Sequence, residues 1–490
     1  MIKQYIFYVF YFIVFQSAAQ EIAFEFIIEK ENTRISTGQF AQDQHNNLVG
    51  PVLYEYFVED TLFSRYSRIY KISEDGDTSS VLFIKPDTLF TVQSVSEVND
   101  DSGGYLLWAI YYQRELGPNK QIEVFIRTDY DLNILWERHF DLGYHYVASG
   151  RKMLQTNKDE LLFACNPNDV FDMYLLKLSA TGDSLDFRYY EGDSAGSVQS
   201  LTYNFDSTGF FIHTWGAYIE PGTVFNSLIE INEDLEQVDI KFYPDWYDRP
   251  YETILWPGNN FLSAGYEKEI NGSAFDKYFT AYILDENLEV IEKRRLSSPD
   301  TASNPAWFRN MDVVDNSFIY VGGSFDGHYH SSNDTSWFYI AMLDYNLDII
   351  YEKYIGGDMH YWCDCITATN DGGVFMSGLL FPVYQTPIFH KAYLVKLDTT
   401  DIPLYIDKPG QLKLYDALIY PNPGNDHLNI RTTLKNAWFE LYDIKGKLLI
   451  CQAINKHITT INTDHLSAGM YVYNICNKNK VLQTGKWIKK

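Results

Sequence analysis

The stretch DGGVFMSG at residues 371–378, followed by AYLVKLD at residues 392–398, decides the fold of this chain. A Gly/Asp turn leads into an apolar strand, and after a variable segment an aliphatic strand ends in an acidic turn. The same pattern recurs at residues 159–163 with 173–179 and at residues 315–323 with 339–344. Such a repeat predicts a fold that is built from copies of one small β unit.

The turn after the aliphatic strand measures the repeat length. It falls near Gly76, Asp131, Gly182, Asp234, Asn287, Asn346 and Thr400, in steps of 55, 51, 52, 53, 59 and 54 residues. Seven units of about four short strands each are typical of a β-propeller. The sequence therefore predicts an all-β, seven-bladed β-propeller over residues 20–404, with six or eight blades as alternatives. An array of β-sandwiches is disfavoured because the units lack an independent core.

An extra apolar segment precedes the first unit at residues 22–28. The seventh unit reaches its aliphatic strand at residues 393–397, and the chain then leaves through Pro403. A strand at 22–28 could pair with the last unit, and this would close a ring and remove an exposed sheet edge.

The first nineteen residues have the pattern of a secretory signal peptide. Lys3 is followed by an uncharged run at 5–15, and the small residues Ser17, Ala18 and Ala19 stand before Gln20. The apolar core is too short for a transmembrane helix, and no other stretch approaches eighteen apolar residues. Residues 1–19 are thus expected to be removed on export.

The end of the chain is expected to form a second domain. A linker at residues 405–417 leads to 418–490, where Pro421 and Pro423 interrupt any ladder. Short segments rich in Ile, Leu, Val, Tyr and Phe follow at 427–432, 437–443, 447–453 and 470–476. The turn at 443–447 contains Gly446, which can adopt a positive φ. This pattern predicts a small, Ig-like β-sandwich.

Residues 418–490 resemble the type A C-terminal sorting domain of the type IX secretion system of Bacteroidetes. The resemblance rests on YPNPG (420–424), LNI (428–430), FELYDIKGKL (439–448), LSAGMYVY (466–473) and GKWIKK (485–490). It implies a sorting motif that includes Pro421, Asn422, Pro423, Gly446, Gly469, Tyr471, Gly485 and Lys486. It also implies export by the Sec route to the periplasm, recognition by the type IX machinery, and a final location on the cell surface or in the medium.

The net charge differs between the two predicted domains. Residues 418–490 carry ten basic and four acidic residues, whereas residues 20–417 carry 28 basic and 61 acidic residues, a net charge of −33. A body this acidic disfavours binding to nucleic acid or to an anionic membrane. Solubility outside the cell explains the charge, and calcium-binding loops are the alternative.

Candidate chemistry is concentrated in one loop, at residues 326–334. His328, His330 and Asp334 could bind a ligand or a metal ion, or could belong to a polar connection. Residues 101–104 and 166–169 have a composition like that of calcium loops but lack the closing Glu, so turns are favoured and no cofactor is identified.

The five cysteines are Cys165, Cys363, Cys365, Cys451 and Cys476, an odd number in an exported chain. Cys451 and Cys476 could pair. His360, Cys363 and Cys365 lie close together, but no second ligand pair is visible, so buried strand thiols are favoured over zinc.

Three functions remain open for the body. Motifs for a zinc protease, a phosphate loop and a dinucleotide site are absent from the sequence, which favours a non-enzymatic module that binds glycan, peptide or protein. A propeller enzyme, a hydrolase or lyase of extracellular polysaccharide, is the first alternative, because many carboxylates could converge. A structural or adhesive component of the cell surface is the second. Exposed tryptophans among the eight of the body could stack on sugar rings.

Overall fold

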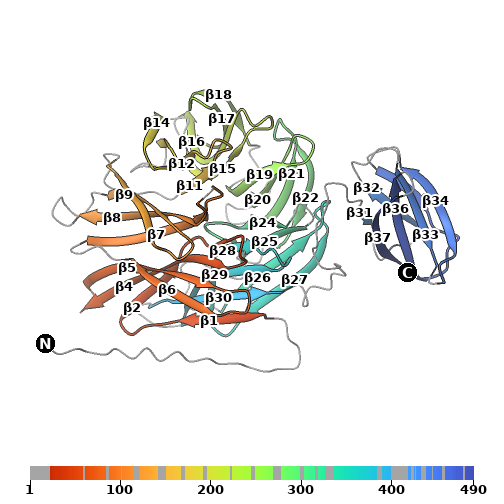
Figure 1. Cartoon of the computed structure of the whole chain (residues 1–490), viewed down its shortest axis with the longest axis horizontal. Helices are drawn as coiled ribbons and strands as arrows, with labels where there is room; N and C mark the ends of the chain where they lie inside the picture. Colours follow the sequence, from red (N-terminus) through yellow and green to blue (C-terminus); the bar gives the residue numbers. More distant parts are fainter. Residues whose placement is uncertain are drawn as a thin grey trace. The chain divides into compact units, whose positions relative to one another are not determined.

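The computed structural model describes residues 22–398 and 418–490, except for 59–60, 84–87, 101, 114–120, 142–150, 167–171, 191–195, 221–222, 244–248, 269–276, 298–302, 315–317, 326–334, 383–388, 421–423, 425, 432–436, 444, 455–457 and 478–479. Throughout these residues the helices and strands assigned are all β-strands, which confirms the predicted all-β class. The chain divides into two compact units, Met1–Leu404 and Tyr405–Lys490 (Figure 1). The expected signal peptide at 1–19 lies outside the described residues.

The described residues of the first unit form seven antiparallel sheets, which we number in chain order. Sheet 1 contains β2 (Thr33–Thr37), β3 (Ala41–Gln42), β4 (Leu48–Val58), β5 (Thr61–Ile72) and β6 (Thr78–Phe83). Sheet 2 contains β7 (Thr88–Glu97), β8 (Tyr105–Gln113), β9 (Gln121–Thr128) and β10 (Ile134–Phe140). Sheet 3 contains β11 (Arg151–Gln155), β12 (Leu161–Cys165), β13 (Met173–Leu178) and β14 (Ser184–Tyr190). Sheet 4 contains β15 (Ser197–Tyr203), β16 (Gly209–Glu220), β17 (Thr223–Asn232) and β18 (Gln237–Phe242).

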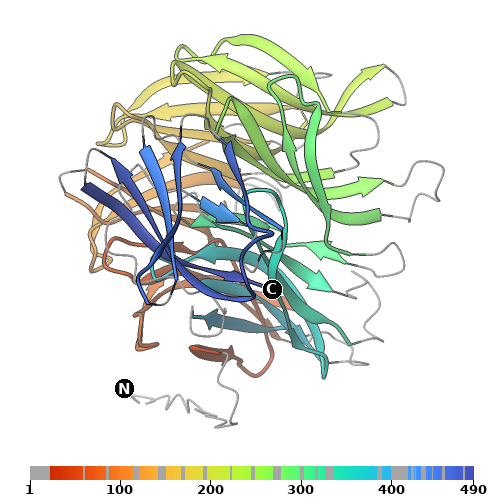
Figure 2. The same ribbon diagram turned by 90° about the vertical axis from the view of Figure 1, so that its right-hand side faces the viewer.

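The remaining sheets complete the unit. Sheet 5 contains β19 (Arg249–Trp256), β20 (Asn260–Lys268), β21 (Lys277–Leu284) and β22 (Val290–Arg295). Sheet 6 contains β23 (Asn304–Pro305), β24 (Met311–Val314), β25 (Phe318–Phe325), β26 (Trp337–Leu343) and β27 (Ile349–Gly356). Sheet 7 contains β28 (His360–Ala368), β29 (Val374–Phe381), β30 (Lys391–Leu397) and, from the start of the chain, β1 (Phe24–Ile28). The strands of each sheet lie side by side in both ribbon views (Figures 1 and 2).

Hydrophobic clusters join each sheet to the next, and the series closes on itself. Between sheets 2 and 3, Trp108 meets Phe163 edge-on with 5.3 Å between ring centroids. Between sheets 7 and 1, Phe40 lies 5.0 Å from Phe375 by the same measure. The other five neighbouring pairs share clusters of the same kind. Each sheet therefore buries both of its faces against its neighbours, which is the main source of stability for sheets this small.

The closing pair is formed by the two ends of the unit. β1 pairs with β30, in register from Phe24 opposite Lys396 to Ile28 opposite Ala392. The predicted pairing of residues 22–28 with the last unit is confirmed. Phe24 also packs against Phe375 of sheet 7, so the added strand contributes to the core as well as to the ladder.

A recurring turn links the third and fourth strands of most sheets. Leu132, Leu235, Leu288 and Leu347 occupy it with φ between +57° and +66°, a conformation that few non-glycine residues adopt. In sheet 5 one carboxylate oxygen of Asp285 accepts hydrogen bonds from the backbone N–H groups of Asn287 and Glu289, at 2.8 and 2.9 Å. The leucine is buried in the cluster between its own sheet and a neighbour; Leu288, for example, is 1% exposed. Burial of the leucine offsets the strain of the turn, and the predicted turn near Asn287 is confirmed.

The second unit consists of two sheets around one core. The smaller sheet contains β31 (Leu418–Tyr420), β32 (His427–Arg431) and β35 (Ile458–Asn462). The larger sheet contains β33 (Ala437–Tyr442), β34 (Leu448–Ile454), β36 (Gly469–Asn477) and β37 (Lys480–Lys489). Leu428 from the smaller sheet and Phe439, Ile475 and Trp487 from the larger one are completely buried in a common cluster.

Candidate functional site

The inner strand is the first strand in sheets 1–6 and is β28 in sheet 7, where β1 forms the outer edge. Nearly every residue of β28 is buried, whereas most residues of the last strands, such as β14, are exposed. Inner strands of neighbouring sheets form parallel bridges, Gln39 with Ser94 and Arg309 with Cys365. Figure 1 shows β11, β24 and β28 near the middle of the unit. The inner strands therefore meet at the centre, and their side chains form the candidate site.

Four inner strands are interrupted by β-bulges. The register shifts around Gln93 in β7, Gln199 in β15, Tyr251 in β19 and Asp364 in β28. A bulge adds an unpaired residue, bends the strand and redirects a side chain, and bulges are frequent next to functional sites.

The bulges also release backbone carbonyls that the neighbouring sheet uses. The carbonyl of Gln93 accepts a hydrogen bond from the N–H of Gln39 at 3.0 Å, and that of Asp364 accepts one from the N–H of Phe308 at 2.7 Å. These bonds connect sheet 1 to sheet 2 and sheet 6 to sheet 7. The irregular inner strands thus join the sheets where they converge.

In sheet 6 the inner strand is divided, and residues 306–310 form a loop between β23 and β24, which we call the central loop. Both of its ends are held by Gly322, which accepts a hydrogen bond from the N–H of Ala306 at 3.0 Å and donates one to the carbonyl of Asn310 at 2.8 Å. A Cβ atom on Gly322 would lie 2.9 Å from side-chain atoms of Ile340 and Ile366. The close approach therefore requires glycine.

Charged side chains from separate sheets meet at the central loop. Lys152 Nζ of β11 donates hydrogen bonds to Glu252 Oε2 of β19 and to the carbonyl of Phe308, both at 3.0 Å. The Lys152 and Glu252 side chains are 15% and 13% exposed. Arg309 forms an ion pair with Asp312 at 3.3 Å. One lysine therefore connects sheets 3, 5 and 6 at the centre.

Burial perturbs the two inner carboxyls. Burial raises the pKa of the Glu252 carboxyl, and the charge and hydrogen bond of Lys152 oppose the increase. Burial raises the pKa of Asp364 to about 7, although the hydroxyl of Thr37 donates a hydrogen bond to Asp364 Oδ2 at 3.1 Å and favours the ionised form. Asp364 therefore takes up and releases a proton near neutral pH.

The central loop also carries an accessible aromatic ring. Trp307 is 36% exposed and is the most exposed tryptophan in the described part of the first unit. Its ring packs edge-on against Tyr251, with 6.2 Å between centroids, and Tyr251 packs in turn against Tyr266 at 5.8 Å. Tyr251 is a bulge residue directly before Glu252, and Trp307 directly precedes Phe308, whose carbonyl Lys152 binds. This aromatic pair and the adjacent charges constitute the candidate site.

The predicted ligand residues His328, His330 and Asp334 lie outside the described residues. β25 ends at Phe325 before this connection, and β26 begins at Trp337 after it. These two residues are paired in the ladder. Assignment of a ligand to this connection stays a prediction.

The two cysteines of β28 are buried, as the sequence predicts for inward-facing strand thiols. Cys363 and Cys365 are buried free thiols on either side of the Asp364 bulge. Groups of three or more His, Cys, Asp and Glu that could hold a metal are absent from the part of the chain that the structure describes. Cys451 and Cys476 are both free, and their strands lie on opposite sides of β33, so the possible pairing between them is not formed.

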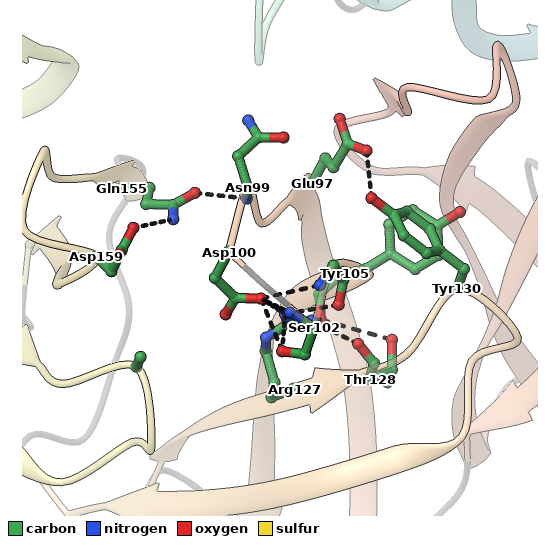
Figure 3. A network of polar contacts seen from close by, with 12 residues as sticks. Glu97, Asn99, Asp100, Ser102, Tyr105, Arg127, Thr128, Tyr130, Gln155 and Asp159 are labelled. Atoms are coloured by element: carbon green, nitrogen blue, oxygen red, sulfur yellow. Dashed lines mark hydrogen bonds and ion pairs between the residues drawn. The ribbon is translucent and has the colours of Figure 1, made fainter.

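The turn at residues 100–104 is held by an arginine (Figure 3). The buried Arg127 donates hydrogen bonds from Nη2 to Asp100 Oδ1 at 3.0 Å and to the Gly103 carbonyl at 2.7 Å. Asp100 Oδ1 also accepts from the N–H of Ser102 at 3.0 Å. Burial by itself would raise the pKa of Asp100, but the hydrogen bonds from Ser102 and Arg127 outweigh it and lower the pKa. The Asp100 carboxylate is thus bound by groups of the protein itself.

Several residues of the expected sorting motif have structural roles. Gly446 has a φ of +80°, as predicted for its turn. The hydroxyl of Tyr471 donates a hydrogen bond to the Ser467 carbonyl at 2.6 Å. A Cβ atom on Gly485 would lie 2.3 Å from the Tyr473 hydroxyl oxygen, so a side chain there would displace the tyrosine. Gly469 begins β36 and Lys486 lies exposed on β37, whereas Pro421, Asn422 and Pro423 are outside the described residues.

Sequence reasoning missed the centre of the first unit. Lys152 and Glu252 are 100 positions apart and Lys152 and Phe308 are 156 apart, so local spacing contains no sign of their contact. One signal was present, since Asp364 is the one acidic residue in a strand composed mainly of aromatic and aliphatic residues and cysteines. Such a residue indicates a bulge or an unusual environment.

Comparison with solved structures yields distant likenesses. PorZ, described as an essential surface component of the type IX secretion system of Porphyromonas gingivalis, is 10% identical with a TM-score of 0.29, over 93% of this chain and 81% of PorZ. A fungal alcohol oxidase of the AA5 family in complex with copper is 9% identical with a TM-score of 0.41, over 95% and 98%. The polysaccharide lyase Uly1 is 9% identical with a TM-score of 0.45, over 77% and 100%. We draw no activity from similarities of this size.

Sequence comparison identifies the second unit. No curated protein matches the chain. Helices able to span a membrane are not found among the described residues. Residues 418–490 match the family described as the secretion system C-terminal sorting domain. The chain therefore carries a type IX C-terminal sorting domain at residues 418–490 and is exported to the cell surface or secreted.

Proposed function

We propose that this protein is an exported ligand-binding protein whose first unit is a seven-bladed β-propeller. Seven sheets, seven shared clusters and the pairing of β1 with β30 support this architecture. We propose an Ig-like sandwich for the second unit, which addresses the protein to the type IX machinery after Sec export. The ligand is bound at the centre of the propeller.

One observation carries the binding proposal. Trp307 is exposed on a loop whose two ends are fixed by Gly322. A large apolar ring in a fixed position is costly to expose and contributes strongly to binding when a ligand covers it. The neighbouring Lys152 and Glu252 supply donors and acceptors that can orient a ligand.

The test compares the full-length chain with its W307A variant. The panel contains a neutral polysaccharide, a polyuronate, a lysine-rich peptide and a glutamate-rich peptide, with affinities measured by isothermal titration calorimetry. We expect at least one ligand to bind the wild type, and W307A to weaken it at least about tenfold. If no ligand binds, or if W307A binds as well as the wild type, a ligand site at Trp307 is refuted.

The W438A variant is the matched control. Trp438 is 47% exposed on β33 of the second unit, so this substitution also removes a surface tryptophan. It should leave binding unchanged. Thermal melting of both variants separates a loss of binding from a loss of structure.

A polysaccharide-cleaving enzyme is the second candidate. Glu252 and Asp364 are inner carboxyls with raised pKa values, as general acids require. Incubating each polysaccharide with the protein and measuring new reducing ends and unsaturated products distinguishes turnover from binding. If the wild type forms products and if E252Q and D364N each abolish them, the protein is an enzyme. This result would replace the binding proposal.

A further inference from the structure

We infer that the ligand of the Trp307 site is an uncharged glycan, a conclusion about ligand class that rests on the proposed binding function. The aromatic pair contributes the first part of the argument. The C–H face of a pyranose ring carries partial positive charge and is apolar, so it packs on the negative face of an indole. A single exposed tryptophan backed by Tyr251 and Tyr266 offers one such platform on rigid support.

The local charges contribute the second part. Two of the described cations adjoin the central loop and both are paired, Lys152 with Glu252 and Arg309 with Asp312. A polyuronate would have to compete with these carboxylates for the two cations. A cationic ligand would likewise have to compete with Lys152 and Arg309 for the two carboxylates. The pairs therefore leave a site that is polar but nearly neutral, with oxygen acceptors and N–H donors suited to hydroxyl groups.

The charge of the whole body contributes the third part. Residues 20–417 carry a net charge of −33, which repels polyanions at long range. Screening limits this field to about 8 Å at physiological ionic strength, so the paired local charges decide the ligand class there. Lower salt should accordingly weaken binding of anionic chains further while leaving a neutral glycan unaffected.

The experiment uses affinity electrophoresis of the full-length chain in gels that contain one polysaccharide each. The neutral gels contain cellulose ether, xylan, mannan or laminarin, the anionic gels alginate or polygalacturonate, and the cationic gel chitosan. We expect retardation that depends on Trp307 in at least one neutral gel and in none of the charged gels, since the acidic body adds a non-specific retardation in chitosan that W307A leaves unchanged. W307A should weaken that retardation at least about tenfold in apparent Kd, W307F should retain part of it, and W438A should match the wild type.

The outcomes separate this inference from the proposed function. Retardation by a polyuronate or by chitosan that W307A weakens overturns the neutral class, but it leaves the Trp307 site in place. The absence of retardation in every neutral and anionic gel, together with peptide binding that depends on Trp307, overturns the glycan and leaves the binding function. Neutral glycan binding that W307A does not weaken places the ligand elsewhere and overturns both.

Discussion

Lys152 Nζ lies 3.0 Å from Glu252 Oε2, which joins the inner strands of sheets 3 and 5 although the two residues are 100 positions apart. The same ammonium group donates to the Phe308 carbonyl of sheet 6. Each partner retains only a small exposed fraction, so water compensates poorly for the loss of either one. The contact is therefore important for the stability of the first unit as well as for the candidate site.

A double-mutant cycle measures this coupling. We expect K152M and E252Q each to lower the free energy of unfolding by about 2–4 kcal/mol, because each leaves a partly buried partner unpaired. The double variant K152M/E252Q should lose less than the sum, since it leaves neither charge alone. Denaturant unfolding monitored by tryptophan fluorescence provides the three values.

The surface pair Lys158–Glu233 is a suitable control. Its side chains are 59% and 47% exposed, and K158M should lower the stability far less than K152M does. Additive effects at Lys152 and Glu252 would show that the central ion pair contributes no coupling energy.

Local features of the fold were predictable, whereas the centre was not. The Asp285–Glu289 turn and the alternation of its flanking strands depend on neighbouring residues, so periodicity and turn chemistry indicate them. The pairing of β1 with β30 follows from the unpaired edge that an open ring would expose. The central loop depends on the convergence of separate sheets, and a contact such as Lys152 with Phe308 has no counterpart in local sequence.

Asp364 should make stability depend on pH. Burial raises its pKa from 3.8 to about 7, so the folded protein binds the proton more tightly than the unfolded chain. Its contribution is therefore fully favourable below about pH 4 and decreases as the pH rises to about 7. The complete loss corresponds to about 4 kcal/mol at most.

The D364N variant tests this dependence. Asparagine stays uncharged and can still accept the hydrogen bond of Thr37. Relative to the wild type, D364N should gain stability between pH 4 and pH 7 and then maintain a constant advantage. Parallel stability profiles of the two proteins across this range would show that Asp364 titrates as an ordinary surface carboxyl.

At position 288, a glycine substitution should destabilise the protein less than an alanine substitution, which is the opposite of the usual order. The φ of +66° at Leu288 strains any residue with a Cβ atom, and the leucine side chain is 1% exposed. Both L288A and L288G lose the buried side chain, at about 2–5 kcal/mol. Only L288G relieves the strain, so it should be more stable than L288A by about 1 kcal/mol. Chemical denaturation of the two variants measures the difference, and equal stability would indicate that the turn is relaxed.

Removal of residues 418–490 should separate export from folding. The core of the second unit is composed only of residues from that unit, and sheets 1–7 are complete without it. The truncated chain should therefore keep the melting temperature of the first unit but remain in the periplasm, because it lacks the sorting domain. Fractionation of the native host, with full-length W438A as a control for an intact sorting domain, provides the measurement. Truncated protein at the cell surface or in the medium would show that the first unit contains an export signal of its own.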